Sequence, residues 1–319
     1  MDDFAAWIGR SETRHDSIGP TPVHALNATL DHAPMAVVPG TTLPPLWHWL
    51  YFLPLPRASE IGPDGHARRG DFLPPVALPR RMWAGSQFDF HAPLRVGDQV
   101  ERRSTIEDIT LKQGRTGALV FVKVRHELRC NGRPEAALVE WHDIVYRDAR
   151  QPGEVEPPPQ RAPEIEEYPG GGQRLRGAWG RTASGSGSPG PDARPLGGQR
   201  PQEAWGRTLI PDEVLLFRYS ALTFNSHRIH YDRHYVTEVE GYPGLVVHGP
   251  LIATLLMDLL RREWPHAEVS VFRFKAVRPT FDGQPMRVCG QPARDGQSVR
   301  LWAQDHQGWL TMDALATLR

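Results

Sequence analysis

The chain has 319 residues, enough for two domains of about 100–150 residues each. Its 37 basic and 37 acidic side chains give a formal net charge of +0, which argues against a nucleic acid or a membrane surface as the main partner. The chain has only two cysteines, Cys130 and Cys289, far apart in the sequence and in no metal or redox spacing, which rules out a disulfide framework. No apolar stretch is long enough to cross a bilayer. The acidic start of the chain is unlike a signal or transit peptide, so we expect a cytoplasmic protein.

Composition divides the chain into two folded halves, 1–150 and 206–319, separated by residues 151–205. The intervening segment is rich in Pro, Gly, Ser and Arg and lacks the apolar residues that a packed core needs. It also contains a short duplication, because residues 171–182 resemble residues 197–208. We therefore expect a disordered linker between the halves.

In the first half, the apolar segment 43–52 predicts a helix, since its opening prolines can occupy a first helical turn without losing hydrogen bonds. A Phe88-x-Phe90 pattern follows. Two segments of alternating polarity, 116–129 and 136–147, are then joined at Asn131-Gly132, which is a strong hairpin signal. The pattern predicts an antiparallel meander.

The second half repeats this order. Its helix candidate, 250–262, is apolar nearly all round, so we expect a sheet to bury it. A Phe272-x-Phe274 pattern follows, and the alternating segments 299–304 and 309–318 are joined through Gln307-Gly308. Each half is therefore expected to be an antiparallel sheet around one helix.

The densest polar cluster lies in residues 219–232, which include Asn225, His227 and His230. A second short motif, His248-Gly249, immediately precedes the apolar helix. The chain from Asn225 to Asp232 reads Asn-Ser-His-Arg-Ile-His-Tyr-Asp.

These motifs resemble those of the MaoC-like, type 2 enoyl-thioester hydratase family, which has Asp-x-Asn-Pro-x-His in a loop and His-Gly at the start of a central helix. The family's Asp, Asn, Pro and His fall on Asn225, His227, Arg228 and His230, its following Asp on Asp232, and its His-Gly on His248 and Gly249. The subfamily of mesaconyl- or itaconyl-CoA hydratases and yeast-type 3-hydroxyacyl-thioester dehydratases resembles the chain more closely, because it carries the same Asn. The first half resembles that subfamily's degenerate amino-terminal domain.

The resemblance implies an α+β double hot-dog, with two antiparallel sheets each wrapping a central helix in one chain. It also implies a hydro-lyase that adds water to, or removes it from, a 2-enoyl thioester in the second half, while the first half shapes the acyl pocket. We expect a short branched dicarboxylic acyl-CoA of the mesaconyl, itaconyl or citramalyl type. The alternatives are a 3-hydroxyacyl-ACP or -CoA dehydratase of fatty-acid or polyketide synthesis, a hot-dog acyl-CoA thioesterase, and a thioester-binding subunit without activity.

His230 is the expected acid–base residue, because an imidazole can move protons near neutral pH. The amide of Asn225 cannot exchange a proton, so two accounts stay open. In one, His230 acts alone as base and then acid while Asn225 places the water. In the other, His227 or Asp232 supplies a second proton-transfer group.

The backbone N–H of Gly249, beside His248, is expected to hold the thioester oxygen at the start of the helix. Arg228, Asp232 and Tyr242 are candidates for binding the substrate. Arg228 is suited to a substrate carboxylate or to an internal ion pair, and Asp232 is equally suited to capping the helix that follows it.

We expect no cofactor and no metal. The glycines of Gly185-x-Gly187-x-x-Gly190 have no strand before them and no helix after them, and the paired histidines lack a third ligand at a typical spacing. The expected partner is an acyl-CoA thioester. A homodimer is left open, because two hot-dog halves in one chain can already pair with each other.

Overall fold

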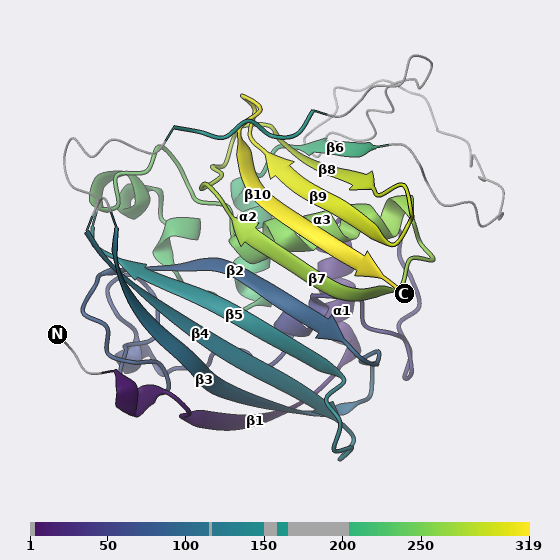
Figure 1. The fold of residues 1–319 in the computed structure, drawn as a ribbon, viewed down its shortest axis with the longest axis horizontal. Helices are drawn as coiled ribbons and strands as arrows, with labels where there is room; N and C mark the ends of the chain where they lie inside the picture. The colour runs from purple at the N-terminus through teal and green to yellow at the C-terminus, as the bar shows by residue number, and fades with distance from the viewer. Residues whose placement is uncertain (1–3, 115–116, 150–157, 165–203) are drawn as a thin grey trace.

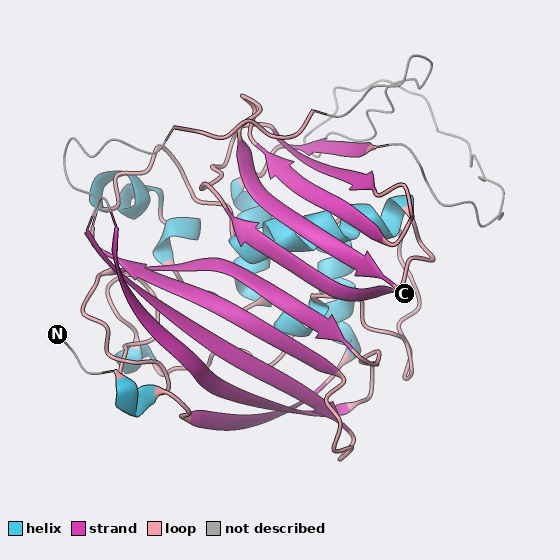
Figure 2. Cartoon of the chain, in the orientation of Figure 1, coloured by secondary structure: helices cyan, strands magenta, loops and turns pink. Residues whose placement is uncertain are grey.

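The computed structural model describes residues 4–114, 117–149, 158–164 and 204–319. Within them, ten strands form one antiparallel sheet in the order β1-β3-β4-β5-β2-β7-β10-β9-β8-β6 (Figures 1 and 2). The strands are β1 (Ser11–Ser17), β2 (Arg80–Phe90), β3 (Gln99–Gly114), β4 (Gly117–Cys130), β5 (Leu138–Arg147), β6 (Trp205–Leu209), β7 (Val269–Ala276), β8 (Met286–Pro292), β9 (Ser298–Gln304) and β10 (Leu310–Leu318). The two predicted hairpins, β4–β5 and β9–β10, are confirmed.

The two halves meet at β2 and β7, which pair antiparallel. Phe88 of β2 lies opposite Phe272 of β7, and their rings stack with centroids 6.1 Å apart. Both side chains are fully buried, so the Phe-x-Phe patterns of the two halves form one shared core. This pairing joins the two expected sheets edge to edge into one continuous sheet.

Helix α3 (Gly249–Glu263) is the central helix of the second half, as predicted. Every side chain from Leu251 to Leu260 is buried, and the helix packs against β6, β8, β9 and β10. Helix α2 (Glu213–Leu222) precedes it, with the Asp212 side chain accepting a hydrogen bond from the backbone N–H of Leu215 at 2.8 Å. The core of this half therefore forms around α3.

The helix predicted at 43–52 is wrong. Only a single 3₁₀ turn, η2 (Trp47–Leu50), forms there, because Leu46 and Phe52 on either side have positive φ angles of 71° and 54°. A right-handed helix cannot continue through such residues. The α-helix of the first half is instead α1 (Pro20–Thr29), a short element that lies beside α2.

Residues 158–164, part of the expected linker, lie along β10. The backbone N–H of Leu310 donates to the Gln160 carbonyl at 2.8 Å, and the Arg161 guanidinium stacks on Trp309. The rest of the expected linker up to 203, with the first copy of the duplication, lies outside the described residues. Among the helices that the structure describes, none is long and apolar enough to cross a membrane.

Candidate functional site

A cavity of about 940 Å³ lies between the two halves of the chain. Five of the predicted site residues line it, and these are Asn225, His227, His230, Tyr242 and Gly249. The other three, Arg228, Asp232 and His248, do not line it. The segment after α2 therefore brings the predicted imidazoles and the N-terminus of α3 to a single cavity.

The segment that carries the imidazoles is held in place by local turns. Phe224, with a φ of 48°, ends the run of α2, and the Asn225 side-chain oxygen accepts a hydrogen bond from the backbone N–H of His227 at 3.0 Å. A 3₁₀ turn, η4 (Arg228–His230), follows directly. This arrangement fixes the Asn225 amide as the start of a turn at the cavity wall.

His230 is buried, and its ring orientation is fixed. Its Nδ1 donates to the backbone carbonyl of Val246 at 2.7 Å, because a carbonyl can only accept. The proton therefore resides on Nδ1, and Nε2 keeps a lone pair. Burial lowers the pKa of His230 to about 4, so the imidazole is neutral at pH 7 and can take up a proton.

His248 supports His230 from behind. The two rings stack with centroids 3.6 Å apart, and His248 Nε2 is 2.8 Å from the hydroxyl oxygen of Ser220. Burial lowers the pKa of His248 well below its ordinary value, so it packs as a neutral ring. Its neighbour Gly249 is the first residue of α3, where backbone N–H groups have no acceptor within the helix.

Arg228 and Asp232 bind each other. Arg228 Nη2 lies 2.7 Å from Asp232 Oδ2, and its guanidinium stacks on the ring of Tyr235. The other carboxylate oxygen of Asp232 accepts from the backbone N–H of Tyr235 at 2.9 Å. Both residues thus have the internal contacts that the sequence left open as alternatives, an ion pair for Arg228 and a cap for Asp232.

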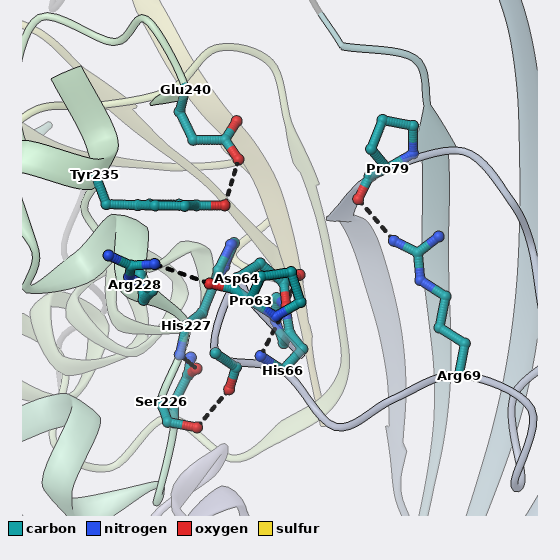
Figure 3. Close-up of polar contacts among 12 residues, drawn as sticks. Pro63, Asp64, His66, Arg69, Pro79, Ser226, His227, Arg228, Tyr235 and Glu240 are labelled. Carbon is teal, nitrogen blue, oxygen red and sulfur yellow. Dashed lines mark hydrogen bonds and ion pairs between the residues drawn. The ribbon is translucent and has the colours of Figure 1, made fainter. Parts of the chain in front are cut away.

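The first half contributes two site residues that the sequence reasoning missed, Asp64 and His66 (Figure 3). His66 Nδ1 donates to Asp64 Oδ2 at 3.0 Å, and the His66 ring lies 3.9 Å from the ring of His227. Asp64-Gly65-His66 stands in a loop without alternating or helical periodicity, where Asp-Gly indicates only a turn. Nothing in the local pattern indicates that this loop reaches the second half.

Asp64, His66 and His227 are also the groups that could hold a metal ion, since one ligand atom from each lies within 4.8 Å of the others. The hydrogen bond between Asp64 and His66 engages the carboxylate and Nδ1 of the imidazole. The pKa of His66 is lowered to about 4, first by burial and then by the charge of Arg81. Burial alone would raise the pKa of Asp64, but the hydrogen bond from His66 brings it below its ordinary value.

Polar residues of the first half form the opposite wall. Buried Glu140 accepts hydrogen bonds from His48 Nε2 at 3.1 Å and from the Trp49 indole at 3.3 Å. Burial alone would raise the pKa of Glu140, but the bond from His48 holds it at about 2. Arg81 on β2 also lines the cavity, where its side chain hydrogen-bonds to Tyr146, and no ion pair among the described residues joins it to a carboxylate. The cavity therefore contains a guanidinium that forms no ion pair among the described residues.

Sequence comparisons relate the chain to enzymes of thioester chemistry. The model of the hydroxyacyl-thioester dehydratase type 2 family matches residues 46–169 and 187–282. The chain is 40% identical over 321 residues to the mesaconyl-C(4)-CoA hydratase of Chloroflexus aurantiacus, covering 99% of this chain and 98% of the relative. It is 26% identical to the mitochondrial hydroxyacyl-thioester dehydratase type 2 of Schizosaccharomyces pombe, covering 86% and 88%.

Solved structures support the fold. A MaoC-like dehydratase superposes with a TM-score of 0.66 at 14% identity, covering 99% of both chains. A Mycobacterium tuberculosis protein described as a double hotdog superposes with a TM-score of 0.55 at 13% identity, covering 98% of this chain and 96% of that one. The continuous sheet with its buried helix is therefore a double hot-dog, as expected.

Proposed function

Because this chain belongs to the hydroxyacyl-thioester dehydratase type 2 family, we propose that it hydrates a 2-enoyl thioester, or dehydrates the matching 3-hydroxyacyl thioester, of a short branched dicarboxylic acid. The observation that carries the proposal is that the free Nε2 side of His230 and the N-terminus of α3 meet at one cavity. Hydration of a double bond conjugated to a thioester needs both a group that moves protons and a donor to the thioester oxygen.

In the hydration direction, the oxygen of water bonds to the β-carbon and the electron pair of the double bond moves toward the thioester oxygen. The resulting enolate is then protonated at the α-carbon. His230 is the proposed proton carrier, since its neutral Nε2 can accept a proton and return it. The N–H of Gly249 is the proposed donor to the enolate oxygen, because the dipole of α3 also favours negative charge there.

A second proton-transfer group is proposed among the residues that line the cavity. His227 meets this condition and Asp232 does not, because the carboxylate of Asp232 is occupied by Arg228 and by the backbone of Tyr235. Asn225 is proposed to orient the water. Its side-chain oxygen has a second lone pair besides the one that accepts from His227.

The dicarboxylic substrate is supported by the mesaconyl-C(4)-CoA hydratase relative and by Arg81. Such a thioester keeps one free carboxylate, and a guanidinium can bind it with two parallel hydrogen bonds. Arg81 lines the cavity without an acidic partner among the described residues, whereas Arg228 is held by Asp232 outside the lining. We therefore propose Arg81 as the carboxylate-binding residue.

Replacing Arg81 tests this substrate class. We expect Arg81→Gln to raise KM for mesaconyl-C4-CoA by about 10- to 100-fold, since a charge-assisted pair contributes about 1.5–3 kcal/mol. KM for crotonyl-CoA, which has no second carboxylate, should change by less than threefold. Equal changes for both substrates would remove Arg81 and the free carboxylate from the proposal.

A panel of enoyl- and 3-hydroxyacyl-CoA thioesters tests the reaction itself. Loss of enoyl absorbance without release of free thiol is expected for a hydratase. Thiol release without hydration would instead identify a thioesterase. A preference for monocarboxylic 3-hydroxyacyl thioesters on CoA or a carrier protein would favour the 3-hydroxyacyl dehydratase alternative, which the Schizosaccharomyces pombe relative supports.

A cytoplasmic location is part of the same proposal. One chain is proposed to hold a complete site, since both halves line the cavity. A homodimer of such chains remains a prediction, which sedimentation of the purified protein would test.

A further inference from the structure

We propose that Asp64 and His66, supplied by the first half, form the water-activating pair of this site and take the place of the carboxylate that Asn225 does not provide. His66 would exchange the proton of water, and Asp64 would be the positioning residue behind it. The inference rests on the proposed hydration of an enoyl thioester. It gives the first half a direct part in the chemistry.

The loop that carries the pair is docked tightly on the segment that carries the imidazoles. The backbone N–H of Arg228 donates to the Asp64 carbonyl at 2.9 Å, and the Ser226 hydroxyl donates to the Gly65 carbonyl at 2.5 Å. Arg228 Nη1 also donates to the carbonyl of Pro63 at 3.0 Å (Figure 3). These hydrogen bonds between the two segments hold His66 beside His227.

The tautomer of His66 suits a base. One carboxylate oxygen of Asp64 accepts a hydrogen bond from the backbone N–H of His66, and the other accepts one from Nδ1 of the ring. Nδ1 therefore carries the proton. Nε2 is left with a lone pair, and His66 lines the cavity together with His227 and His230. A carboxylate oriented in this way also stabilises the imidazolium that forms when Nε2 accepts a proton.

His230 lacks such a counter-charge. Its Nδ1 faces only the carbonyl of Val246, and its ring neighbours are His227 and His248. A positive charge that persists on His230 is therefore less well stabilised than the same charge on His66. The water proton is better held beside Asp64, whose pKa is lowered so that it stays ionised.

The proton count closes with all three imidazoles neutral at the start. As the oxygen of water bonds to the β-carbon, its proton passes to His66 Nε2 and the electron pair of the double bond moves onto the thioester oxygen. The proton then crosses His227, whose ring centroid is 3.9 Å from that of His66 and 5.4 Å from that of His230. His230 delivers it to the α-carbon as the enolate collapses, and every imidazole is neutral again.

The test separates the two proton transfers in the dehydration direction. In His66→Asn the new amide can still donate to Asp64 but has no base at the Nε2 position. We expect kcat for dehydration to fall by about 10²–10⁴-fold with KM changed less than threefold. In D₂O, the α-hydrogen of the 3-hydroxyacyl thioester should still exchange, because His230 remains. In His230→Asn, both exchange and dehydration should be lost.

Asp64→Asn should lower kcat in the same direction, and His24→Asn, which replaces an exposed histidine on α1, should leave it unchanged. If His66→Asn keeps more than half of the wild-type kcat, the inference is overturned. If His66→Asn loses α-hydrogen exchange as fully as His230→Asn does, the assignment of water activation to His66 and of α-proton transfer to His230 is wrong. Activity that disappears on dialysis against EDTA and returns with Zn²⁺ would make the cluster a metal site and also overturn it.

A wild-type chain that hydrates none of the thioesters in the panel would instead contradict the proposed function itself. That outcome is measured before any variant is made. The two failures are therefore distinguishable, since the first leaves wild-type hydration intact and the second does not.

Discussion

At the scale of single residues, burial keeps several of the described imidazoles neutral at pH 7. Burial is the largest cause that lowers the pKa of each of these histidines, to about 4 for His66, His142 and His230, to about 3 for His126, and well below the ordinary value for His227 and His248. A neutral imidazole is a competent base at pH 7. The same burial makes the folded state sensitive to acid.

The sign of that sensitivity follows from proton binding. Between about pH 6.5 and pH 4 the unfolded chain binds protons at these histidines and the folded chain does not, so the free energy of unfolding falls as the pH falls through this window. Each histidine contributes about 1.4 kcal/mol per pH unit. We expect the urea midpoint to drop steeply between pH 7 and pH 5.

Two variants check the origin of this slope. His126→Gln removes one buried imidazole and should make the free energy of unfolding depend less on pH. His91→Gln replaces an exposed histidine and should leave the slope unchanged. A urea midpoint that is constant from pH 7 to pH 5 would contradict the prediction.

Which site residues can be predicted from the sequence depends on how far apart along the chain their contacts lie. His230 and Gly249 were predicted, because a contiguous motif carries one and the start of an apolar helix carries the other, and both line the cavity. Asp64 and His66 were missed, because their importance comes from hydrogen bonds to residues far along the chain. No periodicity in a short loop encodes such a contact.

At the scale of elements, the loop 61–67 is the feature that assembles the site. It is closed by a bridge between Ile61 and Ala67, and Gly65 within it has a φ of +89°. A Cβ atom on Gly65 would lie 1.9 Å from the carbonyl oxygen of Ser226. Only glycine therefore allows the loop to approach the imidazole segment this closely.

Gly65→Ala is expected to undock this loop and to lower kcat by more than 10-fold, because His66 moves away from His227. Gly40→Ala is the matched control, since Gly40 has the same φ of +89° but open space around a Cβ. Both variants carry the backbone strain of about 1 kcal/mol, and only Gly65→Ala adds the steric clash. Equal kcat values for the two variants would contradict the role of docking.

The elements themselves were predictable where one periodicity dominates. Helix α3 and the two hairpins follow from a continuous apolar run and from alternation around Gly-containing turns. Helix α1 was missed because it is short and opens with two prolines, Pro20 and Pro22. The segment 43–52 has helical composition, but the φ angles of Leu46 and Phe52 prevent a helix, and composition does not reveal such angles.

At the scale of the whole molecule, the halves are held together by more than the β2–β7 pairing. Asp258 of α3 is 1% exposed, and its carboxylate lies 2.6 Å from Nε of Arg262 and 2.6 Å from Nε2 of His32, which belongs to the first half. Arg262 also donates to the carbonyl of Leu30. The central helix of one half is thereby tied to the chain that follows α1 in the other.

Asp258→Asn should lower the free energy of unfolding by about 2–3 kcal/mol, because it removes the buried carboxylate from the partly buried guanidinium of Arg262 and from the ring of His32. Asp313→Asn, which breaks the partly exposed pair with Arg300, should cost less than about 1 kcal/mol. Urea unfolding followed by fluorescence measures both. Similar values for the two variants would show that the contact between α3 and His32 does not hold the halves together.

The antiparallel pairing of Phe88 with Phe272 places two similar subdomains about an approximate twofold axis inside a single polypeptide. In an assembly of identical copies, every mutation appears on both sides of such an axis. A fused chain is released from that constraint. Here one side carries the histidine motif, while the other carries a glycine-dependent loop and an arginine that lines the cavity, so each side can serve a different purpose.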